Sequence, residues 1–142
     1  MNNLLRTILT VALLTTVCCS EDQSAGKGNA KEASKWLTHL NPEEASKLLQ
    51  SDNRPVVLDI RTPFEFKSGN IAGAVSIDYY GKDFEGKLEK FDKAKPILVH
   101  CRSGGRSRES LAKFEKLGFK EVYHLDGGIL AWDKAGLPIE KK

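Results

Sequence analysis

Residues 97–107 read Ile-Leu-Val-His-Cys-Arg-Ser-Gly-Gly-Arg-Ser, and the class of fold can be inferred from them. Residues 97–99 form an apolar run of the kind found in strands that are buried on both faces. A short polar segment with two adjacent glycines follows, and we predict that a helix begins at about Ser107. Such a strand–loop–helix unit is typical of α/β proteins with a parallel sheet.

The same alternation continues on both sides of this stretch. Asn41 and Thr62 are each followed by a proline and, three residues on, by a glutamate, which is the capping-box pattern of a helix start. We therefore expect an α/β fold with a mainly parallel central sheet. The strands are predicted at 56–60, 71–77, 97–99 and 122–125, and the helices at 42–50, 62–69, 84–91, 107–117 and 129–135.

Three segments that follow predicted strands are candidates for a site. In parallel sheets, ligands bind in the crevice at the carboxyl ends of the strands. We expect residues 59–61, 101–106 and 126–128 to meet there. Residues 126–128 are most simply a turn. Asp59 and Arg61 are expected to pair with each other or with loop backbone groups, in a structural role near the site.

The chemistry is predicted to reside in the loop that contains Cys101. A thiol at a helix N-terminus, with the guanidiniums of Arg102 and Arg106 nearby, is favoured as the thiolate. Gly104 and Gly105 permit backbone conformations that are closed to other residues, so that successive N–H groups can turn inward around the sulfur. Arg106 is predicted to close this ring and to hold an oxyanion group bidentately. An already deprotonated nucleophile needs no general base.

The first 35 residues are predicted to lie outside the folded domain. Arg6 precedes an apolar run at 8–17, which is too short to span a bilayer and is typical of a secretory signal. The run ends at Cys18 and Cys19, which resemble the processing site of bacterial lipoproteins, with simple cleavage as the alternative. We expect an exported protein that is periplasmic or anchored to the membrane by a lipid on one of these cysteines. The chain then divides into a signal peptide at 1–19, a flexible polar linker at 20–35 and a folded domain at 36–142.

Composition and cysteine usage narrow the function further. The 142 residues carry a formal net charge of +3, with Lys and Arg scattered among Asp and Glu, so no nucleic-acid partner is expected. Two of the three cysteines lie at the end of the predicted signal, which leaves only Cys101 in the domain. In an oxidising compartment a lone thiol is either buried and inert or kept for its reactivity. His39, His100 and His124 are too dispersed to suggest a metal site, and we expect neither a metal nor a cofactor.

Three ordered motifs resemble those of the rhodanese sulfurtransferases. The loop at 101–107 resembles the active-site loop of that family. The resemblance covers about residues 36–139, which is nearly all of the predicted domain. Asn70 stands where a histidine is usual and Phe64 where an acidic residue is common, which affects local packing rather than catalysis. The other two motifs are an N-terminal signature at 57–63, 65–66 and 69–74, and a C-terminal one at 126–128, Trp132 and 136–138.

The resemblance implies a rhodanese-like fold, with helices on both faces of the sheet, and a double-displacement reaction. Cys101 is the implied catalytic residue. It takes sulfane sulfur from a small anion such as thiosulfate and passes it, as a persulfide, to cyanide, a thiol or a protein. The implied substrate-binding residues are Arg102, Ser103, Gly104, Gly105 and Arg106, with Asp59 and Arg61 in support.

Other functions fit parts of the pattern. The main alternative among enzymes is a cysteine phosphatase or an arsenate reductase. Cysteine phosphatases also surround an anion with a loop between a Cys and an Arg, but their loops have five intervening residues and this one has four. No aspartate is clearly placed as the general acid that a phosphate ester needs. A module that only binds a partner has no use for the pair of Cys101 and Arg106. Cys101 as an inert core thiol and Arg102 as a solvated surface charge are the simplest alternatives, and His100 is interpreted as structural.

Overall fold

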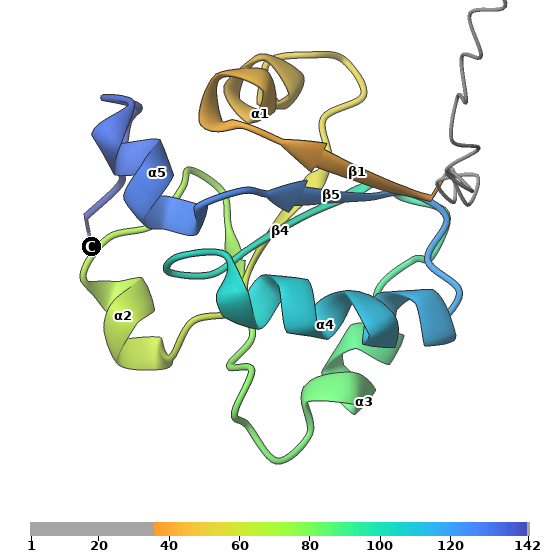
Figure 1. The fold of residues 1–142 in the computed structure, drawn as a ribbon. Coiled ribbons are helices and arrows are strands. Elements are labelled where there is room, and N and C mark those ends of the chain that lie inside the picture. Colours follow the sequence, from red (N-terminus) through yellow and green to blue (C-terminus); the bar gives the residue numbers. More distant parts are fainter. Residues whose placement is uncertain (1–35, 142) are drawn as a thin grey trace, which may run out of the picture. The chain divides into compact units, whose positions relative to one another are not determined.

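Strands and helices alternate along residues 36–141, which are the residues that the computed structural model describes (Figure 1). The signal peptide, the two cysteines and the linker predicted at 1–35 lie outside the described residues. In chain order the elements are β1 (Leu37–Leu40), α1 (Pro42–Leu49), β2 (Val56–Asp59), α2 (Pro63–Lys67), β3 (Val75–Ser76), α3 (Phe84–Glu89), β4 (Ile97–His100), α4 (Gly105–Lys116), β5 (Val122–Leu125) and α5 (Gly128–Lys134).

The sheet has five strands in the order β1-β5-β4-β2-β3, and every neighbouring pair is parallel. The predicted α/β fold with a parallel sheet is therefore confirmed. β4 lies at the centre, between β5 and β2, and the loop with Cys101 begins where β4 ends. Because all strands run in the same direction, the loops that follow β2, β4 and β5 leave the sheet at one edge.

Both predicted capping boxes are present. The side chain of Asn41 accepts a hydrogen bond from the N–H of Glu44 at 2.9 Å, and the carboxylate of Glu44 accepts one from the N–H of Asn41 at 2.9 Å. Thr62 and Glu65 form the same reciprocal pair at the start of α2. Each box satisfies two backbone donors that the helix itself cannot satisfy, which fixes the residue at which the helix begins.

Helices cover both faces of the sheet, and the alternation of side chains along β4 shows how. Ile97 and Val99 pack with residues of α3 and α4 in one core, whereas Leu98 packs with residues of α1 and α5 in a second core. All three are buried, and each such side chain contributes about 1.5–3 kcal/mol to folding. Cys101 continues the alternation and belongs to the core under α3 and α4.

Several elements differ from the sequence-based prediction, most clearly β1, β3 and the start of α4. β1 was not predicted, because two of its four residues are exposed and it does not have the composition of a buried strand. The strand predicted at 71–77 is reduced to β3, since Gly73 has a φ of 72° and the N–H of Ala74 closes a turn on the carbonyl of Ile71 at 3.0 Å. α4 begins at Gly105, two residues before the predicted start.

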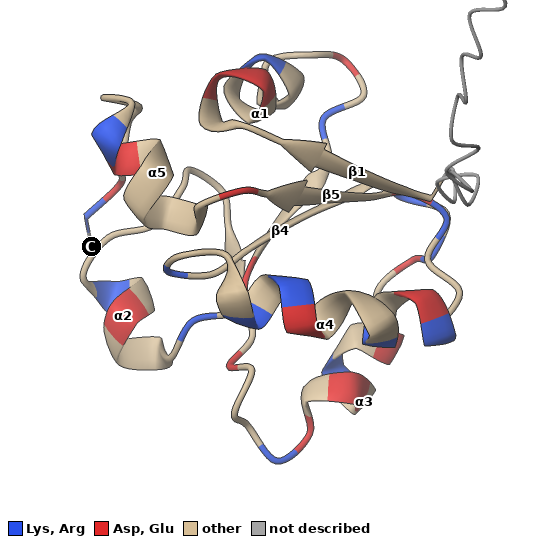
Figure 2. Cartoon of the chain, in the orientation of Figure 1, with Lys and Arg blue, Asp and Glu red and all other residues tan. Residues whose placement is uncertain are grey.

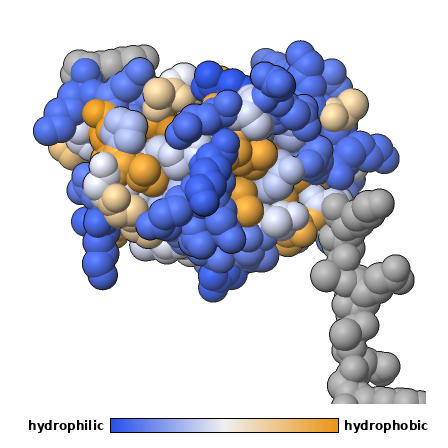
Figure 3. All heavy atoms as spheres, turned by 90° about the horizontal axis from the view of Figure 1, so that it is seen from above, coloured by the Kyte–Doolittle hydropathy of each residue, from blue (hydrophilic) through white to orange (hydrophobic). Residues whose placement is uncertain are grey.

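The surface carries mixed charge. Figure 2 shows Lys and Arg interleaved with Asp and Glu along the helices, as the sequence suggested. Viewed from above, the surface is mostly hydrophilic, with hydrophobic side chains in small separate areas (Figure 3). Among the described residues, no helix combines the length and the apolar character that crossing a membrane requires.

Candidate active site

The start of α5 holds the loop that follows β4. The N–H groups of Ile129 and Leu130 donate to the carbonyl oxygens of Cys101 and Arg102 at 2.9 and 3.0 Å. This close approach depends on Gly128, which has a φ of 59° and no Cβ to collide with the two carbonyls. Two of the three segments predicted to meet at the carboxyl edge of the sheet, 101–106 and 126–128, are therefore in direct contact.

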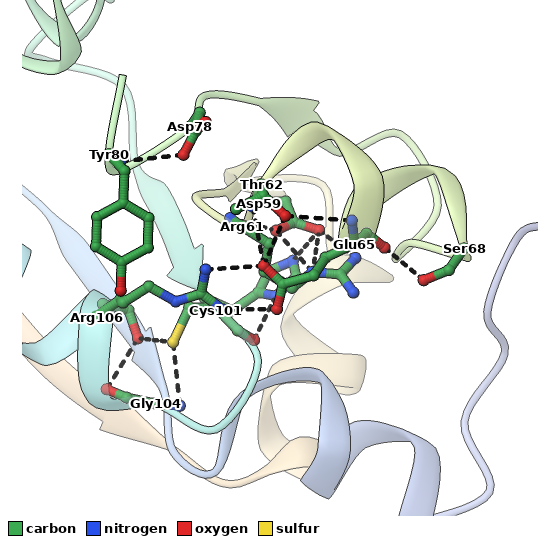
Figure 4. Close-up of polar contacts among 12 residues, drawn as sticks. Asp59, Arg61, Thr62, Glu65, Ser68, Asp78, Tyr80, Cys101, Gly104 and Arg106 are labelled. Atoms are coloured by element: carbon green, nitrogen blue, oxygen red, sulfur yellow. Dashed lines mark hydrogen bonds and ion pairs between the residues drawn. The ribbon is translucent and has the colours of Figure 1, made fainter. Parts of the chain in front are cut away.

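The sulfur of Cys101 is surrounded by hydrogen-bond donors. The side chain is only 1% exposed. The N–H of Gly104 donates to Sγ at 3.2 Å (Figure 4). The hydroxyl of Ser107 also donates to Sγ, at 3.6 Å. Within the part of the chain that the structure describes, Cys101 is a free thiol. The loop thus places donors around the sulfur, as predicted from the helix start and the glycines.

These contacts favour the thiolate. Burial by itself raises the pKa of the Cys101 thiol, but hydrogen bonds from the Ser107 hydroxyl and from the N–H groups of Ser107, Ser103 and Gly104 outweigh it, so that the pKa lies below its ordinary value. The prediction attributed part of this effect to two nearby guanidiniums. In the structure the hydrogen bonds are the larger cause.

The two glycines of the loop have different roles. Gly104 has a φ of 92°, in the region that favours glycine, and an added Cβ would lie 3.2 Å from the N–H nitrogen of Gly127. Gly105 is the first residue of α4 and has ordinary helical geometry with open space around it. The prediction of an unusual conformation is therefore right for Gly104 and wrong for Gly105, because the helix begins earlier than expected.

Arg106 is held by Glu65, a partner that sequence reasoning did not identify. Its Nη1 and Nη2 donate to Oε2 and Oε1 of Glu65 at 2.8 and 2.7 Å, and its guanidinium carbon lies 5.7 Å from the centre of the Tyr80 ring (Figure 4). The guanidinium that was expected to bind an oxyanion bidentately is therefore already paired with a carboxylate of the protein itself. In the sequence, Glu65 could be recognised only as a member of the capping box at the start of α2. Its carboxylate forms hydrogen bonds there as well as with Arg106.

The Arg106 guanidinium, through its hydrogen bonds, lowers the pKa of Glu65 to about 2 from an ordinary 4.5. We expect Glu65→Gln to destabilise the domain by about 1–2 kcal/mol near neutral pH, because a neutral amide replaces a charge-assisted pair. The difference in the free energy of unfolding has its full size above pH 4.5, shrinks as the pH falls and disappears near pH 2. The reason is that Glu65 is protonated at a higher pH in the unfolded state than in the folded state. Urea unfolding at a series of pH values measures it.

Glu109→Gln is the matched control, since Glu109 is exposed and, among the described residues, its hydrogen-bond partner is the hydroxyl of Tyr79 at 3.3 Å. It should change the free energy of unfolding by less than about 0.5 kcal/mol at any pH. A Glu65→Gln effect that does not vary with pH would contradict the assignment of the ion pair as its cause.

Comparison with known proteins places this loop in a family. The model of the family described as rhodanese-like domain matches residues 41–135. The chain belongs to this family. The matched residues run from the N-cap of α1 to the end of α5 and include the Cys101 loop and Gly128.

Relatives of the rhodanese-like domain have different names. A tRNA uridine(34) hydroxylase of Pelagibacter ubique is 39% identical over 97 residues, which are 68% of this chain and 32% of that protein. A sulfurtransferase of Allochromatium vinosum is 31% identical over 103 residues, which are 72% of this chain and 94% of that protein. The chain therefore spans about a third of the hydroxylase and nearly all of the sulfurtransferase.

A solved structure shares the fold. The crystal structure of a rhodanese-related protein from Thermoplasma volcanium aligns with a TM-score of 0.65 and 26% identity, covering 73% of this chain and 98% of that one.

At the rim of the rhodanese-like site, Arg102 and Ser103 are exposed. The carbonyl of Arg102 binds α5, and its side chain faces solvent. The structure therefore brings two of the five residues predicted to bind substrate, Gly104 and Arg106, into the packed part of the site. It leaves Arg102, Ser103 and Gly105 at the solvent-facing side, where an incoming molecule would meet them first.

Asp59 and Arg61 form the expected pair, but they face away from the sulfur. Nη2 of Arg61 lies 2.6 Å from Oδ2 of Asp59 and also donates to the carbonyl of Gly69 at 2.7 Å, and both side chains are buried. Nε2 of the buried His100 lies 3.8 Å from the same carboxylate. These groups lie on the opposite face of the sheet from Cys101, so they support the carboxyl edge and do not contact the nucleophile.

The prediction that the histidines are dispersed is wrong for two of them. Parallel pairing of β1 with β5 places His39 beside His124, and Nδ1 of each lies near the same oxygen of Asp126, at 3.1 and 2.9 Å. The three groups offer atoms within 4.8 Å of one another, which would suit a metal ion. They already satisfy one another, and the Arg108 guanidinium lies 3.8 Å from the same oxygen, so we assign them to a hydrogen-bonded cluster.

Proposed function

We propose that this protein is a sulfurtransferase that moves sulfane sulfur from a small anionic donor such as thiosulfate to a thiophilic acceptor through a persulfide on Cys101. The observation that carries this proposal is the ring of donors around a buried sulfur whose pKa is lowered. Such a ring stabilises a negative charge on the sulfur, and a persulfide has the same charge one atom further out.

The proposed reaction has two displacements. The Cys101 thiolate attacks the outer sulfur of thiosulfate, the S–S bond of the donor breaks, and sulfite leaves with the electron pair. Cyanide or a thiolate then attacks the terminal sulfur of the persulfide, and the Cys101 thiolate is released. We propose that Arg102 and Ser103, at the exposed rim, meet the sulfonate end of the donor, because the fork of Arg106 is held by Glu65.

The sulfurtransferase of Allochromatium vinosum supports this choice among the functions of the family. This chain matches nearly the whole of that protein, and it matches only a third of the hydroxylase from Pelagibacter ubique. The size of the loop supports it too. The four residues between Cys101 and Arg106 form a loop that can surround one extra sulfur atom on the thiolate. A phosphoryl group would bring three oxygens, each of which needs its own hydrogen-bond donors.

We expect the purified protein to transfer sulfur from thiosulfate to cyanide, measured as thiocyanate, and to hydrolyse aryl phosphates no faster than the Cys101→Ser variant. Cys101→Ser should lose at least about 1,000-fold in the sulfur reaction, because the serine hydroxyl is not ionised near neutral pH. Phosphatase turnover that depends on Cys101, in the absence of sulfur transfer, would favour the phosphatase alternative.

Export of the chain, with a lipid on Cys18 or Cys19, stays a prediction from the sequence. Export is compatible with the proposed reaction, because that reaction uses one reactive thiol and needs no second cysteine in the domain.

A further inference from the structure

A chain of hydrogen bonds leads from the buried sulfur of Cys101 to the surface. The hydroxyl of Ser107 lies 3.6 Å from Sγ and 2.9 Å from Nε2 of His124. Nδ1 of His124 lies 2.9 Å from Oδ1 of Asp126. Cys101, Ser107 and His124 are at most 1% exposed, whereas the side chain of Asp126 is 45% exposed. This chain offers the buried thiol a route along which its proton can reach the surface.

The carboxylate fixes the proton positions before transfer. Asp126 can only accept, so the ring of His124 carries its hydrogen on Nδ1 and leaves Nε2 as an acceptor. The hydroxyl of Ser107 lies within reach of three acceptors: Sγ of Cys101, the carbonyl of Gly104 at 3.1 Å and Nε2 of His124. Here it donates to Nε2, and its oxygen accepts from the thiol of Cys101. In this state every group has a partner and none but Asp126 is charged.

We propose that Ser107, His124 and Asp126 form a proton relay in which His124 receives the proton of Cys101 through Ser107. The proton on sulfur passes to Oγ of Ser107, and the hydroxyl hydrogen of Ser107 passes to Nε2 of His124. The products are a thiolate and an imidazolium, so charge and protons balance without a further reactant. Ser107 now donates to the thiolate. This inference rests on the proposed function and deepens it. It assigns a base to Cys101, where the sequence led us to expect none.

The second state also satisfies all of its groups. The new Nε2–H of His124 faces the oxygen of Ser107 at 2.9 Å and the carbonyl of Gly104 at 3.3 Å. Its Nδ1–H keeps the bond to Asp126, whose negative charge now faces an imidazolium. Two discrete arrangements of the same four side chains, each fully bonded, are what a relay requires.

The charged neighbours agree with these roles. Burial lowers the pKa of His124, so the ring is neutral before transfer, and the negative charge of Asp126 acts in the opposite direction and favours the imidazolium. Burial raises the pKa of Asp126, but the hydrogen bonds from His39 and His124 outweigh it, and the group is a carboxylate at neutral pH. The other charged groups that face the relay are Arg108, which is 3.8 Å from Asp126, and Arg106 on the sulfur side.

The test measures the pKa of Cys101 in the whole protein from the pH dependence of its alkylation by iodoacetamide. Alkylation is followed on the peptide that contains Cys101, because Cys18 and Cys19 also react. His124→Leu should slow alkylation about tenfold at about pH 7, which corresponds to one pKa unit, and should leave the rate above pH 10 unchanged. Ser107→Ala should do the same. The double variant should be no slower than either single variant, because one break interrupts the relay as completely as two.

His39→Gln is the matched control. His39 also binds Asp126, but from its exposed side and without contact to Ser107, and the change should be less than about twofold. If His124 has only a packing role, His124→Leu lowers the melting temperature but frees Ser107 to donate to the sulfur. An unchanged or lowered pKa of Cys101 in that variant would overturn the relay.

A second measurement avoids any change in the core. The imidazole ¹⁵N shifts of His124 should report an imidazolium in the reduced wild-type protein at about pH 7 and a neutral ring in Cys101→Ser, which has no acidic proton to give. A neutral ring in both proteins would refute the proposal. Neither readout uses sulfur transfer, so the relay and the proposed function can fail separately.

Discussion

Gly128→Ala is expected to destroy the sulfur site from outside the loop that carries it. A Cβ on Gly128 would lie 2.7 Å from the carbonyl oxygen of Arg102 and closer still to that of Cys101, at a φ of 59°. Strain and overlap together should destabilise the domain by about 2–5 kcal/mol. The loop must move to relieve the overlap, and a shift of about 1 Å at the sulfur should lower sulfur transfer about 100-fold. Thiocyanate production and urea unfolding measure the two effects.

Gly136→Ala is the control that separates steric overlap with the loop from strain in the backbone. Gly136 follows the other end of α5 with a φ of 71°, and an added Cβ would meet nothing within 4 Å. It should lose only about 1–2 kcal/mol of stability through backbone strain and keep its activity. Equal activity in the Gly128→Ala and Gly136→Ala variants would show that the contact between α5 and the loop does not position Cys101.

Arg61→Ala is expected to have the largest effect on stability among charge removals. It leaves the carboxylate of Asp59 buried, 0% exposed, without its ion-pair partner, and removes a donor from the carbonyl of Gly69. Breaking a buried pair in this way costs about 3–5 kcal/mol. Because these groups face away from Cys101, the folded fraction should retain its rate of sulfur transfer. Urea unfolding and activity normalised to folded protein measure the two quantities.

Two variants serve as controls for this prediction. Lys116→Ala removes an ion pair with Glu85 in which both side chains are well exposed, and should cost less than about 1 kcal/mol. Asp59→Leu combined with Arg61→Met removes both buried charges and should be more stable than Arg61→Ala alone. A loss below about 1 kcal/mol in Arg61→Ala would mean that Asp59 finds another partner or water.

The central part of the fold could be predicted from local sequence, because its signals are local. β2 and β4 each begin with three consecutive apolar residues, and α1 and α2 begin with capping boxes that involve residues only three apart. The position of Cys101 between a buried strand and a helix indicated the donors around its sulfur. The family resemblance added the flanking of both faces by helices.

What was missed depends on contacts between residues far apart in the chain. Arg106 meets Glu65 across 41 residues, and His39 meets Asp126 across 87. Neither pairing follows from composition or spacing, because it depends on the order of the strands and on the register of β1 against β5. β1 itself was missed for the same reason, since pairing with β5 rather than its own sequence makes it a strand.

Mass analysis tests the central claim, a persulfide on Cys101, most directly. The reduced protein is exposed to thiosulfate, mercaptopyruvate or polysulfide, freed from excess donor and measured before any acceptor is added. We predict that at least one donor adds one sulfur atom to the peptide that contains Cys101, and that cyanide restores the original mass with release of thiocyanate. In Cys101→Ser the corresponding peptide should gain nothing, whatever happens at Cys18 and Cys19. No gain of mass with any donor, in a folded protein whose Cys101 still reacts with iodoacetamide, would contradict the account.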